Sequence, residues 1–388
     1  MTLLFVLVFL TLIAAELIKG LSANGTPPVL QKYSWQMDLA HLMWSNIIRL
    51  RVFFIGALVV IFVSGGFALP MLVWALPLGA IWGGIYWVFN RFWVGKVKFL
   101  PISQKTFVTA QQNAVDPSLQ VLGVDMGGQQ KAYPVNMIFY HHQITDEIAG
   151  QPIWVTYCGL CRSGRVYDIA VDGKALTFEL VGAITFNAVF RDLQTGSWWR
   201  QETGEAAKGP MQGRALEDVP FEQMSLENWL KKHPNSEILQ YDPAFVGKYA
   251  FLAKLLNYEA SLPGWHRQET PPLIIGVELD GAARAYDFEE LKKRRLVNDT
   301  LGDTPLLLMS DAQGSSGFAY VREVAGETLD FEAAADGLRD TQTGSRWDDF
   351  GRCLEGAHQG ATLRQVQSYQ QFLRAWISFH GHTDFYTF

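Results

Sequence analysis

The chain has 388 residues, enough for two or three domains of ordinary size. Its net charge is −6 and it carries no long run of Lys or Arg, whereas nucleic-acid-binding proteins normally have a basic stripe, so a nucleic-acid partner is not expected. The charged fraction of 18% is below the roughly 25% of ordinary globular proteins, and the deficit lies at the front of the chain.

The first 98 residues are predicted to form a membrane anchor in the lipid bilayer. Residues 52–90 form an uncharged run of 39 residues. One crossing takes about 20 apolar residues, so the run fits two spans, residues 52–69 and 70–90. A turn at Ser64-Gly65-Gly66 is predicted to join them, and the alternative is a buried hairpin of a soluble protein.

An earlier apolar segment, residues 3–18, is interrupted only by Glu16. It is predicted to be a further, uncleaved span, and a signal-like segment is the alternative. Residues 33–50 contain Trp and Leu interspersed with polar residues, and this segment is predicted to lie along the membrane surface.

Basic residues around the hairpin bear on which side of the membrane the rest of the chain occupies. Seven Lys and Arg residues flank the hairpin on one face, and the positive-inside rule makes that face cytoplasmic. The opposite orientation follows if residues 3–18 insert with the N-terminus inside and dominate. The sequence leaves both orientations open.

The remainder of the chain contains an internal repeat. At an offset of 153 residues, Gly123 pairs with Gly276 and Asp146 with Asp299. Shorter offsets of 148 and 147 continue the match, pairing Thr195-Gly196-Ser197 with Thr343-Gly344-Ser345, Trp199 with Trp347, Trp229 with Trp376, and His233 with His380. The sequence therefore predicts two homologous lobes, residues 99–245 and 246–388, preceded by transmembrane helices.

Each lobe is predicted to be α+β and predominantly β. Gly127-Gly128 and Asp172-Gly173 are typical hairpin turns, and Pro152–Tyr157 is a short apolar strand. The segment Ser225–His233 is predicted to be a helix with Ser225 as its N-cap.

Three residues with metal-binding or redox chemistry occur in the first copy only. Cys158 and Cys161 form a C-x-x-C motif whose counterparts are Asp311 and Gly314, and the counterpart of His141 is Arg294. Because the surrounding scaffold persists in both copies, the three residues are predicted to form one site.

The type of chemistry at this site has three interpretations. A Cys2His set suits copper, zinc or iron and leaves a fourth position open. A dithiol without metal is the second interpretation, but a thioredoxin-like motif requires a helix beginning at the cysteines, and here a strand follows. Purely structural thiols are the third. Cys353, alone in the second copy, is interpreted as a packed core residue.

Other polar residues are candidates for lining the site. Next to His141, His142 is a reserve ligand that would point to the opposite face of a strand. Two arginines, Arg162 and Arg165, adjoin the cysteines and would stabilise thiolates or an anionic ligand, with solvated surface arginines as the alternative. Three further candidates come from the loop region and strand that follow: Asn187, Gln201 and Glu202.

Several of these motifs, in order, resemble domain-of-unknown-function family 3179 over roughly residues 118–388. The family has V-T-Y-C-x-L-C after a W-H-E-I-V-N-D stretch, followed by R-x-V-D-G, T-G-S-x-W, G-x-x-x-G-x-x-L and a Trp/His-Pro helix. Here these are Val155–Cys161, Tyr140–Asp146, Ala170–Gly173, Thr195–Trp199, Gly209–Leu216 and Trp229–Pro234.

The resemblance places the family's His on His141 and its cysteines on Cys158 and Cys161. The sequence departs from the family pattern at His142, Gln143 and Thr185-Phe186-Asn187. Members often carry export or lipoprotein signals, which implies an extracytoplasmic domain and opposes the charge count. The extracytoplasmic side is the one favoured here, and the resemblance supplies no biochemical activity.

The leading functional hypothesis is a metal-binding site in an electron-transfer, chaperone or oxidoreductase role. A metal-free thiol–disulfide oxidoreductase is the second hypothesis, and a non-enzymatic module that binds a ligand or partner between the lobes is the third. Whether the protein is an enzyme is left open, and the unknown partner is a protein or a small molecule.

Overall fold

The structure is a computed structural model that describes residues 1–23, 33–93, 95–257, 272–335 and 337–388. Contacts divide the chain into two compact units: unit one holds residues 1–100 and 176–215, and unit two holds residues 101–175 and 216–388. The predicted lobe boundaries at residues 99, 245 and 246 stay predictions. Lys32, one of the basic residues counted above, lies outside the described residues.

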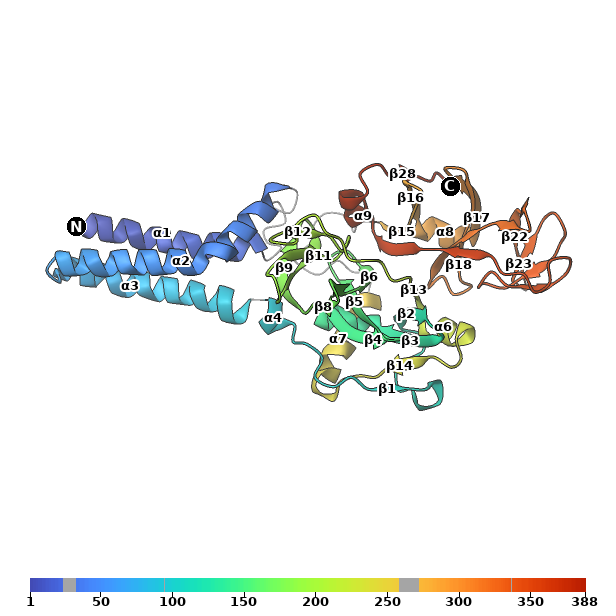
Figure 1. Ribbon diagram of the computed structural model, residues 1–388, viewed down its shortest axis with the longest axis horizontal. Helices are drawn as coiled ribbons and strands as arrows, with labels where there is room; N and C mark the ends of the chain where they lie inside the picture. Colours follow the sequence, from blue (N-terminus) through green and yellow to red (C-terminus); the bar gives the residue numbers. More distant parts are fainter. Residues whose placement is uncertain (24–32, 94, 258–271, 336) are drawn as a thin grey trace. The chain divides into compact units, whose positions relative to one another are not determined.

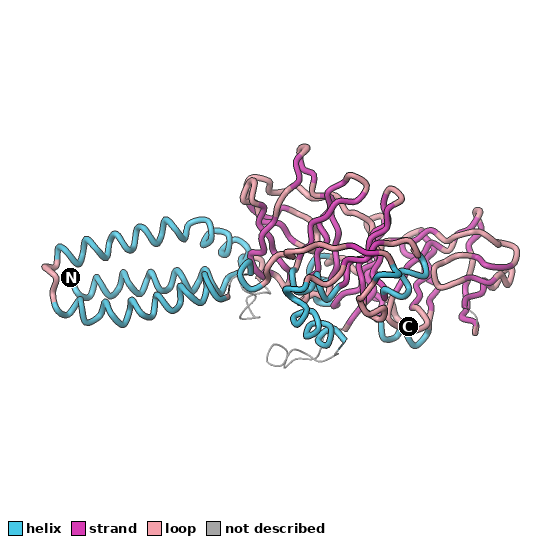
Figure 2. The backbone as a smooth tube through the Cα atoms, turned by 90° about the horizontal axis from the view of Figure 1, so that it is seen from below, coloured by secondary structure: helices cyan, strands magenta, loops and turns pink. Residues whose placement is uncertain are grey.

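Three long helices begin unit one: α1 (Thr2–Ala23), α2 (Trp35–Ser64) and α3 (Leu69–Trp87). They lie side by side in both views of the backbone (Figures 1 and 2). Each is long and apolar enough to span a membrane, and the third candidate span continues to Phe92. The structure therefore contains three helices that could form a membrane anchor.

The turn between α2 and α3 lies where the glycines predicted it. Ser64 ends α2, Gly66 adopts φ +70°, and Pro70 stands in the first turn of α3, where its missing N–H costs nothing. Residues 35–50 belong to α2, which runs from Trp35 to Ser64 without a break, and their position along the membrane surface stays a prediction. No proline interrupts α2, and its one internal glycine weakens the helix without ending it.

A cluster of polar side chains lies inside this helical bundle. Glu16 is fully buried, and its carboxylate accepts hydrogen bonds from Arg51 at 2.5 and 3.1 Å. Asn90 accepts from Arg51 at 3.0 Å and from Lys19 at 2.5 Å. Arg51 also lies over the ring of Tyr86. Every charge in the cluster thus has a partner of opposite sign or a polar partner.

Unit one also contains a four-stranded sheet in the order β12-β11-β10-β9. Its apolar residues Val181, Ile184 and Val189 pack against Met37 and Ala40 of α2. The strand bounds are β9 Phe178–Ile184, β10 Asn187–Asp192, β11 Trp198–Arg200 and β12 Ala206–Lys208. Unit one is therefore a helical bundle joined to a sheet.

The first half of unit two is built from hairpins around a five-stranded sheet, in the order β1-β14-β3-β2-β13. A second sheet has the order β4-β5-β6, and β7 and β8 form a small hairpin. The elements are β1 Phe107–Val108, β2 Gln120–Met126, β3 Gln129–Pro134, α5 Val135–His141, β4 Gln143–Ile148, β5 Gln151–Cys158, β6 Ser163–Asp168, β7 Ala170–Val171, β8 Lys174–Ala175, β13 Glu222–Ser225, α6 Leu226–Lys232, β14 Glu237–Leu239 and α7 Val246–Asn257.

The second half of unit two has sheets in the orders β27-β15-β16-β28, β17-β18-β19-β26 and β22-β23-β24-β25, with the hairpin β20-β21. Its elements are β15 Leu273–Leu279, β16 Ala282–Asp287, α8 Phe288–Arg294, β17 Leu296–Leu301, β18 Thr304–Ser310, β19 Gly317–Val321, β20 Glu323–Val324, β21 Glu327–Thr328, β22 Phe331–Ala334, β23 Gly337–Asp340, β24 Arg346–Trp347, β25 Cys353–Glu355, β26 Arg364–Val366, β27 Ser368–Phe372, α9 Leu373–Phe379 and β28 Asp384–Phe385.

Several of the predicted turns and caps are present. Gly127 and Gly128 join β2 to β3, and the Asp172-Gly173 turn joins β7 to β8. Ser225 caps α6, because its side chain accepts a hydrogen bond from the N–H of Asn228 at 3.2 Å. The chain is thus a mixed α/β protein rich in strands, as the sequence predicted.

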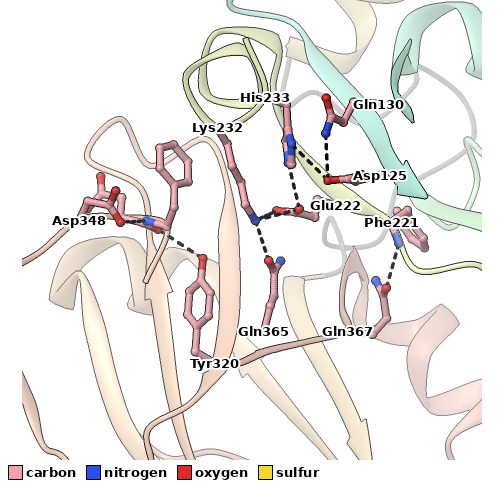
Figure 3. A network of polar contacts seen from close by, with 12 residues as sticks. Asp125, Gln130, Phe221, Glu222, Lys232, His233, Tyr320, Asp348, Gln365 and Gln367 are labelled. Atoms are coloured by element: carbon pink, nitrogen blue, oxygen red, sulfur yellow. Dashed lines mark hydrogen bonds and ion pairs between the residues drawn. The ribbon is translucent and has the colours of Figure 1, made fainter. Parts of the chain in front are cut away.

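The two halves of unit two share a hydrophobic core and a polar network. Met224 and Trp229 of the first half pack in one cluster with Leu307 and Trp347 of the second. The polar network is drawn in Figure 3, where Lys232 on α6 binds the Glu222 carboxylate at 2.7 Å and reaches Gln365 on β26 at 2.9 Å. The halves are consequently joined by apolar burial and by directional bonds.

Candidate functional site: a buried cysteine pair

The Cys158–Cys161 motif forms the turn of a β-hairpin. Cys158 ends β5 and pairs with Ser163, the first residue of β6. Inside the turn the N–H of Cys161 donates to the Cys158 carbonyl at 3.2 Å, and Arg162 adopts φ +53°, a left-handed conformation that few non-glycine residues take. A strand therefore lies on each side of the motif, as predicted, and the thioredoxin arrangement with a helix starting at the cysteines does not apply.

The two sulfur atoms face each other inside the protein. Their separation is 2.9 Å, and the exposed fractions of Cys158 and Cys161 are 2% and 0%. A disulfide bond is about 2.05 Å long, so the sulfurs are not bonded. Two thiolates on one tetrahedral metal ion, with bonds of about 2.3 Å, stand about 3.8 Å apart. The observed separation lies between these two values.

His141 occupies an aromatic cluster at the end of α5. Its Nε2 is 2.7 Å from the hydroxyl of Tyr249 on α7, and the ring of Phe245 stands edge-on to it at 5.1 Å. Burial raises the pKa of Tyr249, which keeps its hydroxyl protonated and able to donate to the imidazole nitrogen.

The predicted ligands His141, Cys158 and Cys161 are not gathered around a metal position. Within the described ranges, no three or more His, Cys, Asp or Glu side chains form a group that could hold a metal ion. Metal binding at these residues stays a prediction, and it would require the His141 ring and the two sulfurs to move together.

His142 is placed differently from the prediction. It follows α5 as its C-cap in a left-handed conformation, φ +63°, so the pair His141-His142 ends a helix and does not alternate across a strand. The ring of His142 stacks on Phe139 at 6.5 Å. The apolar run that contains these residues is too short to distinguish a helix from a strand by periodicity alone.

Residues from the second half of unit two surround the hairpin. The N–H of Phe372, at the end of β27, donates to the Cys161 carbonyl at 2.8 Å. A side chain from α9 reaches the same turn, because Arg374 Nη2 donates to the Leu160 carbonyl at 3.3 Å. Sequence reasoning missed both residues, since neither carries a motif and more than 200 residues separate them from the turn.

Two arginines belong to the surroundings of the cysteine hairpin. Burial lowers the pKa of Arg374, and negative charge on Cys161 and Cys158 opposes that shift. Arg165 is buried, lies over the Tyr369 ring at 3.6 Å and donates to Gln371 at 3.4 Å. It is therefore not the solvated surface residue of the alternative interpretation.

Two more side chains flank the motif directly. The guanidinium of Arg162 lies over the Phe372 ring at 5.4 Å. Burial raises the pKa of Tyr157, although the charge of Arg162 acts in the opposite direction. The Tyr157 hydroxyl thus stays protonated beside the cysteine pair.

The other predicted site-lining residues belong to unit one and bind one another. The Asn187 side-chain amide donates to Gln201 Oε1 at 2.9 Å and accepts from the backbone N–H of Glu202 at 3.0 Å. All three are buried. Their part in the cysteine site stays a prediction.

The turn between β18 and β19 contains Asp311, the residue that the predicted repeat pairs with Cys158. Asp311 accepts hydrogen bonds from Ser315 and Ser316 within its own turn, and from the side chain of Asn228 on α6 at 2.7 Å. This turn is therefore held by a fully engaged Asp, whereas the turn in the first half holds two thiols.

The fold and the site define a class of protein: a strand-rich α/β chain that begins with three helices able to span a membrane and carries a buried cysteine pair on a hairpin. The chain belongs to the family described as protein of unknown function, DUF3179, which matches residues 100–383. No curated protein and no solved structure matches the chain.

Proposed function

We propose that the protein is a membrane-anchored thiol–disulfide redox protein whose reactive group is the Cys158–Cys161 pair. The observation that carries this proposal is the 2.9 Å separation of two buried sulfurs across a tight hairpin turn. The separation of the sulfurs exceeds the length of a disulfide bond by less than 1 Å, so a small movement of the turn brings them to bonding distance.

The proposed reaction exchanges a disulfide between the protein and a partner. One cysteine, as thiolate, attacks a sulfur of the partner's disulfide and releases the first partner thiolate. The second cysteine then attacks the mixed disulfide, which closes the Cys158–Cys161 bond and releases the second partner thiolate. The partner gains two electrons and two protons, the protein loses the same, and the reverse reaction oxidises a partner dithiol.

Positive charge favours the reacting form of the cysteines. Arg374 contacts the turn through the Leu160 carbonyl and interacts electrostatically with both thiolates. A cation beside a thiol stabilises the thiolate, which is the nucleophile in exchange. Arg374 is therefore assigned as a positioning and electrostatic residue that acts on the cysteines.

A second candidate function is soft-metal binding by the same pair. It is favoured by the convergence of two sulfurs on one point, because thiolates select copper(I), zinc and iron. His141 would complete the Cys2His set only by moving closer to the sulfurs, because the three side chains form no metal-holding group among the described residues. The separation of the sulfurs would also have to increase by about 1 Å.

Elemental analysis of the purified full-length protein separates the two candidates. The redox proposal expects substoichiometric copper, zinc and iron in the wild type and in Cys158→Ser alike. One equivalent of metal in the wild type that is lost in Cys158→Ser, with Cys353→Ser as the matched control, would overturn it in favour of metal binding.

The proposal places the cysteine pair on the extracytoplasmic side of the membrane, where disulfides persist. The three candidate spans support a membrane anchor. A cysteine reporter at the exposed residue Lys174 should react with a membrane-impermeant thiol reagent on intact cells. Labelling only after lysis would place this unit in the cytoplasm.

We further propose that the two lobes arose by duplication. The strand orders β14-β3-β2-β13 and β28-β16-β15-β27 agree, and in each the first pair is parallel and the last pair antiparallel. The same partners recur as well: Tyr133 and Lys131 bind Asp146, as Tyr286 and Arg284 bind Asp299. An experimental structure with different strand orders in the two halves would refute the duplication.

Two buried contacts at glycine positions support the same proposal. The Trp229 ring covers Gly123 so closely that a Cβ there would lie 2.3 Å from it, and Trp376 covers Gly276 at 2.6 Å. Beside these rings, His233 pairs with Asp125 and His380 with Glu278. A glycine, a tryptophan and a contact between His and a carboxylate that occur together in both halves are the expected result of a shared ancestor.

A further inference from the structure

The residue that follows the cysteine pair is an arginine in a backbone conformation that few side chains adopt. Arg162 comes directly after Cys161, and its φ of +53° lies in the left-handed region. Glycine adopts this region without strain, whereas a residue with a Cβ is strained there by about 1–3 kcal/mol. Because such strain is concentrated at functional sites, the Arg162 side chain is a candidate for a role beyond closing the turn.

The Arg162 side chain is half-buried and lies in the wall of a small pocket. The pocket has a volume of 110 Å³, and Tyr157, the residue before the Cys158–Cys161 motif, also lines it. The guanidinium lies over the Phe372 ring at 5.4 Å, and Arg162 forms no ion pair with any residue that the structure describes. Its charge is therefore available to an anion that enters the pocket.

A second arginine contacts the same aromatic ring. The guanidinium of Arg374 lies over Phe372 at 5.9 Å and donates to the Leu160 carbonyl, in the turn between the cysteines, at 3.3 Å. The N–H of Phe372 donates to the Cys161 carbonyl at 2.8 Å, so the ring that both arginines contact is bonded to the hairpin. Two positive charges thus lie around one residue of the hairpin's surroundings.

The Tyr157 hydroxyl relates the charge of Arg162 to the cysteines. Burial has the largest effect on this hydroxyl and raises its pKa, the charge of Arg162 lowers the pKa, and negative charge on Cys158 and Cys161 raises it. Arg162 and both cysteines therefore lie within electrostatic range of one group. An anion bound at Arg162 would consequently be held on the side of the hairpin where Tyr157 lies.

Resting on the redox function proposed above, we propose that the Cys158–Cys161 pair exchanges with disulfides that carry a carboxylate near the sulfur, and that Arg162 selects them. The carboxylate binds the guanidinium while one thiolate of the pair attacks a substrate sulfur. The substrate S–S bond breaks and the first substrate thiolate leaves. The second cysteine then displaces the other substrate thiolate and closes the protein disulfide, so the substrate gains two electrons and two protons. One water needs about 10–15 Å³ of such space, so the pocket admits a small group such as a carboxylate.

Oxidation of the reduced full-length protein by three small disulfides tests the proposal. The probes are dithiodiglycolate, which carries a carboxylate next to each sulfur, its neutral diamide, and the cationic disulfide cystamine. The rate of loss of the Cys158 and Cys161 thiols is measured by alkylation and is divided by the rate of each probe with free dithiothreitol, which removes differences in intrinsic reactivity. We expect the normalised rate for dithiodiglycolate to exceed that for the diamide by about tenfold, the size of one charge-assisted hydrogen bond, and cystamine to be slowest.

Variants connect the preference to Arg162. Arg162→Gln should bring the normalised rates of dithiodiglycolate and the diamide close together, because the cation that binds the carboxylate is lost. Arg162→Lys keeps the charge and should retain most of the preference. The control Lys174→Gln removes one positive charge from an exposed hairpin position and should leave the ratio of the two rates unchanged. The ratio is the informative quantity, because a general loss of reactivity lowers both rates alike.

The outcomes separate this inference from the redox proposal. Equal normalised rates for the three probes in the wild type would overturn the selection of anionic substrates and leave the redox function in place. A preference of the same size in Arg162→Gln as in the wild type would overturn the assignment of Arg162. If none of the probes oxidises the pair in the wild type, the redox proposal itself fails, and the inference fails with it.

Discussion

At the scale of single residues, the redox chemistry proposed for the cysteine pair depends on a cation from a distant part of the sequence. Arg374 is partly buried, its guanidinium donates to the turn between the cysteines, and burial lowers its pKa while thiolate charge opposes that effect. Because the interaction is mutual, the redox proposal predicts that Arg374 stabilises the reduced, thiolate-containing form relative to the disulfide.

Replacing this arginine should therefore make the disulfide harder to reduce. We expect Arg374→Gln to shift the midpoint potential of the pair to a more negative value by up to about 30 mV, which is a tenfold change in the exchange equilibrium. The measurement is a redox titration followed by thiol alkylation. Arg364→Gln, at an exposed position of β26, removes the same charge and should leave the potential unchanged. A shift of equal size in both variants would mean a general charge effect.

The residue-scale features differ in how far the sequence predicted them. The hairpin around Cys158 and Cys161 was predictable, because strand-forming residues flank both sides of a short turn. The contact of His141 with Tyr249 was not, because Tyr249 lies on α7, 108 residues further along the chain, and the predicted repeat carries no information about that helix. Arg374 was not predictable for the same reason: only tertiary packing brings α9 to the turn.

At the scale of elements, a polar cluster holds the three N-terminal helices together. Glu16 on α1 and Arg51 on α2 form the central ion pair, and Asn90, just beyond α3, bonds both. Burying an ion pair contributes little net stability, but removing one partner leaves the other charge without compensation.

Arg51→Leu should accordingly destabilise the bundle by about 3–5 kcal/mol, because the Glu16 carboxylate stays buried after the guanidinium that pairs with it has been removed. Thermal unfolding in detergent micelles measures the effect. Arg49→Leu, two residues earlier on the exposed side of the same helix, should change stability little. The double variant Glu16→Gln/Arg51→Leu should recover part of the loss, and an equally unstable double variant would contradict the ion-pair explanation.

The end of a helix was predictable from the sequence where a particular residue type, such as glycine, terminates it. The turn at Gly65 and Gly66 was located from the sequence because glycine tolerates the positive φ that the turn needs. The start of α2 was placed at residue 52 and lies at Trp35, since the polar residues before Val52 do not themselves terminate a helix. The composition of the sequence thus locates the apolar part of a candidate span more reliably than it locates the first residue of the helix.

At the scale of the whole molecule, the two halves of unit two are joined by a polar network whose contribution to stability depends on pH. Burial of Glu222 raises the pKa of its carboxyl, but its bonds with His233 and Lys232 outweigh that effect and hold the pKa below its ordinary value. Lys232 also reaches Gln365 in the other half, as Figure 3 shows.

The sign of the resulting pH dependence follows from linkage. A carboxyl with a depressed folded-state pKa contributes stability that is fully present above the unfolded pKa of about 4.3 and is lost as pH falls through the lower folded value. The free energy of unfolding should therefore decrease below about pH 4.3 with a slope that Glu222→Gln reduces. Urea unfolding at a series of pH values measures it. An unchanged slope in the variant, with the exposed Glu227→Gln as control, would show that Glu222 is not responsible.

The most direct test of the proposed function is the redox equilibrium of the Cys158–Cys161 pair in the full-length protein. The protein is equilibrated with glutathione buffers of graded potential, the remaining thiols are alkylated, and the mass of the peptide that contains the motif is determined. We expect a reversible two-electron transition in which both cysteines change together, and its absence in Cys158→Ser. A peptide that stays fully reduced across the whole range of potentials, or that forms only mixed disulfides with glutathione, would contradict the assignment of the pair as a redox centre.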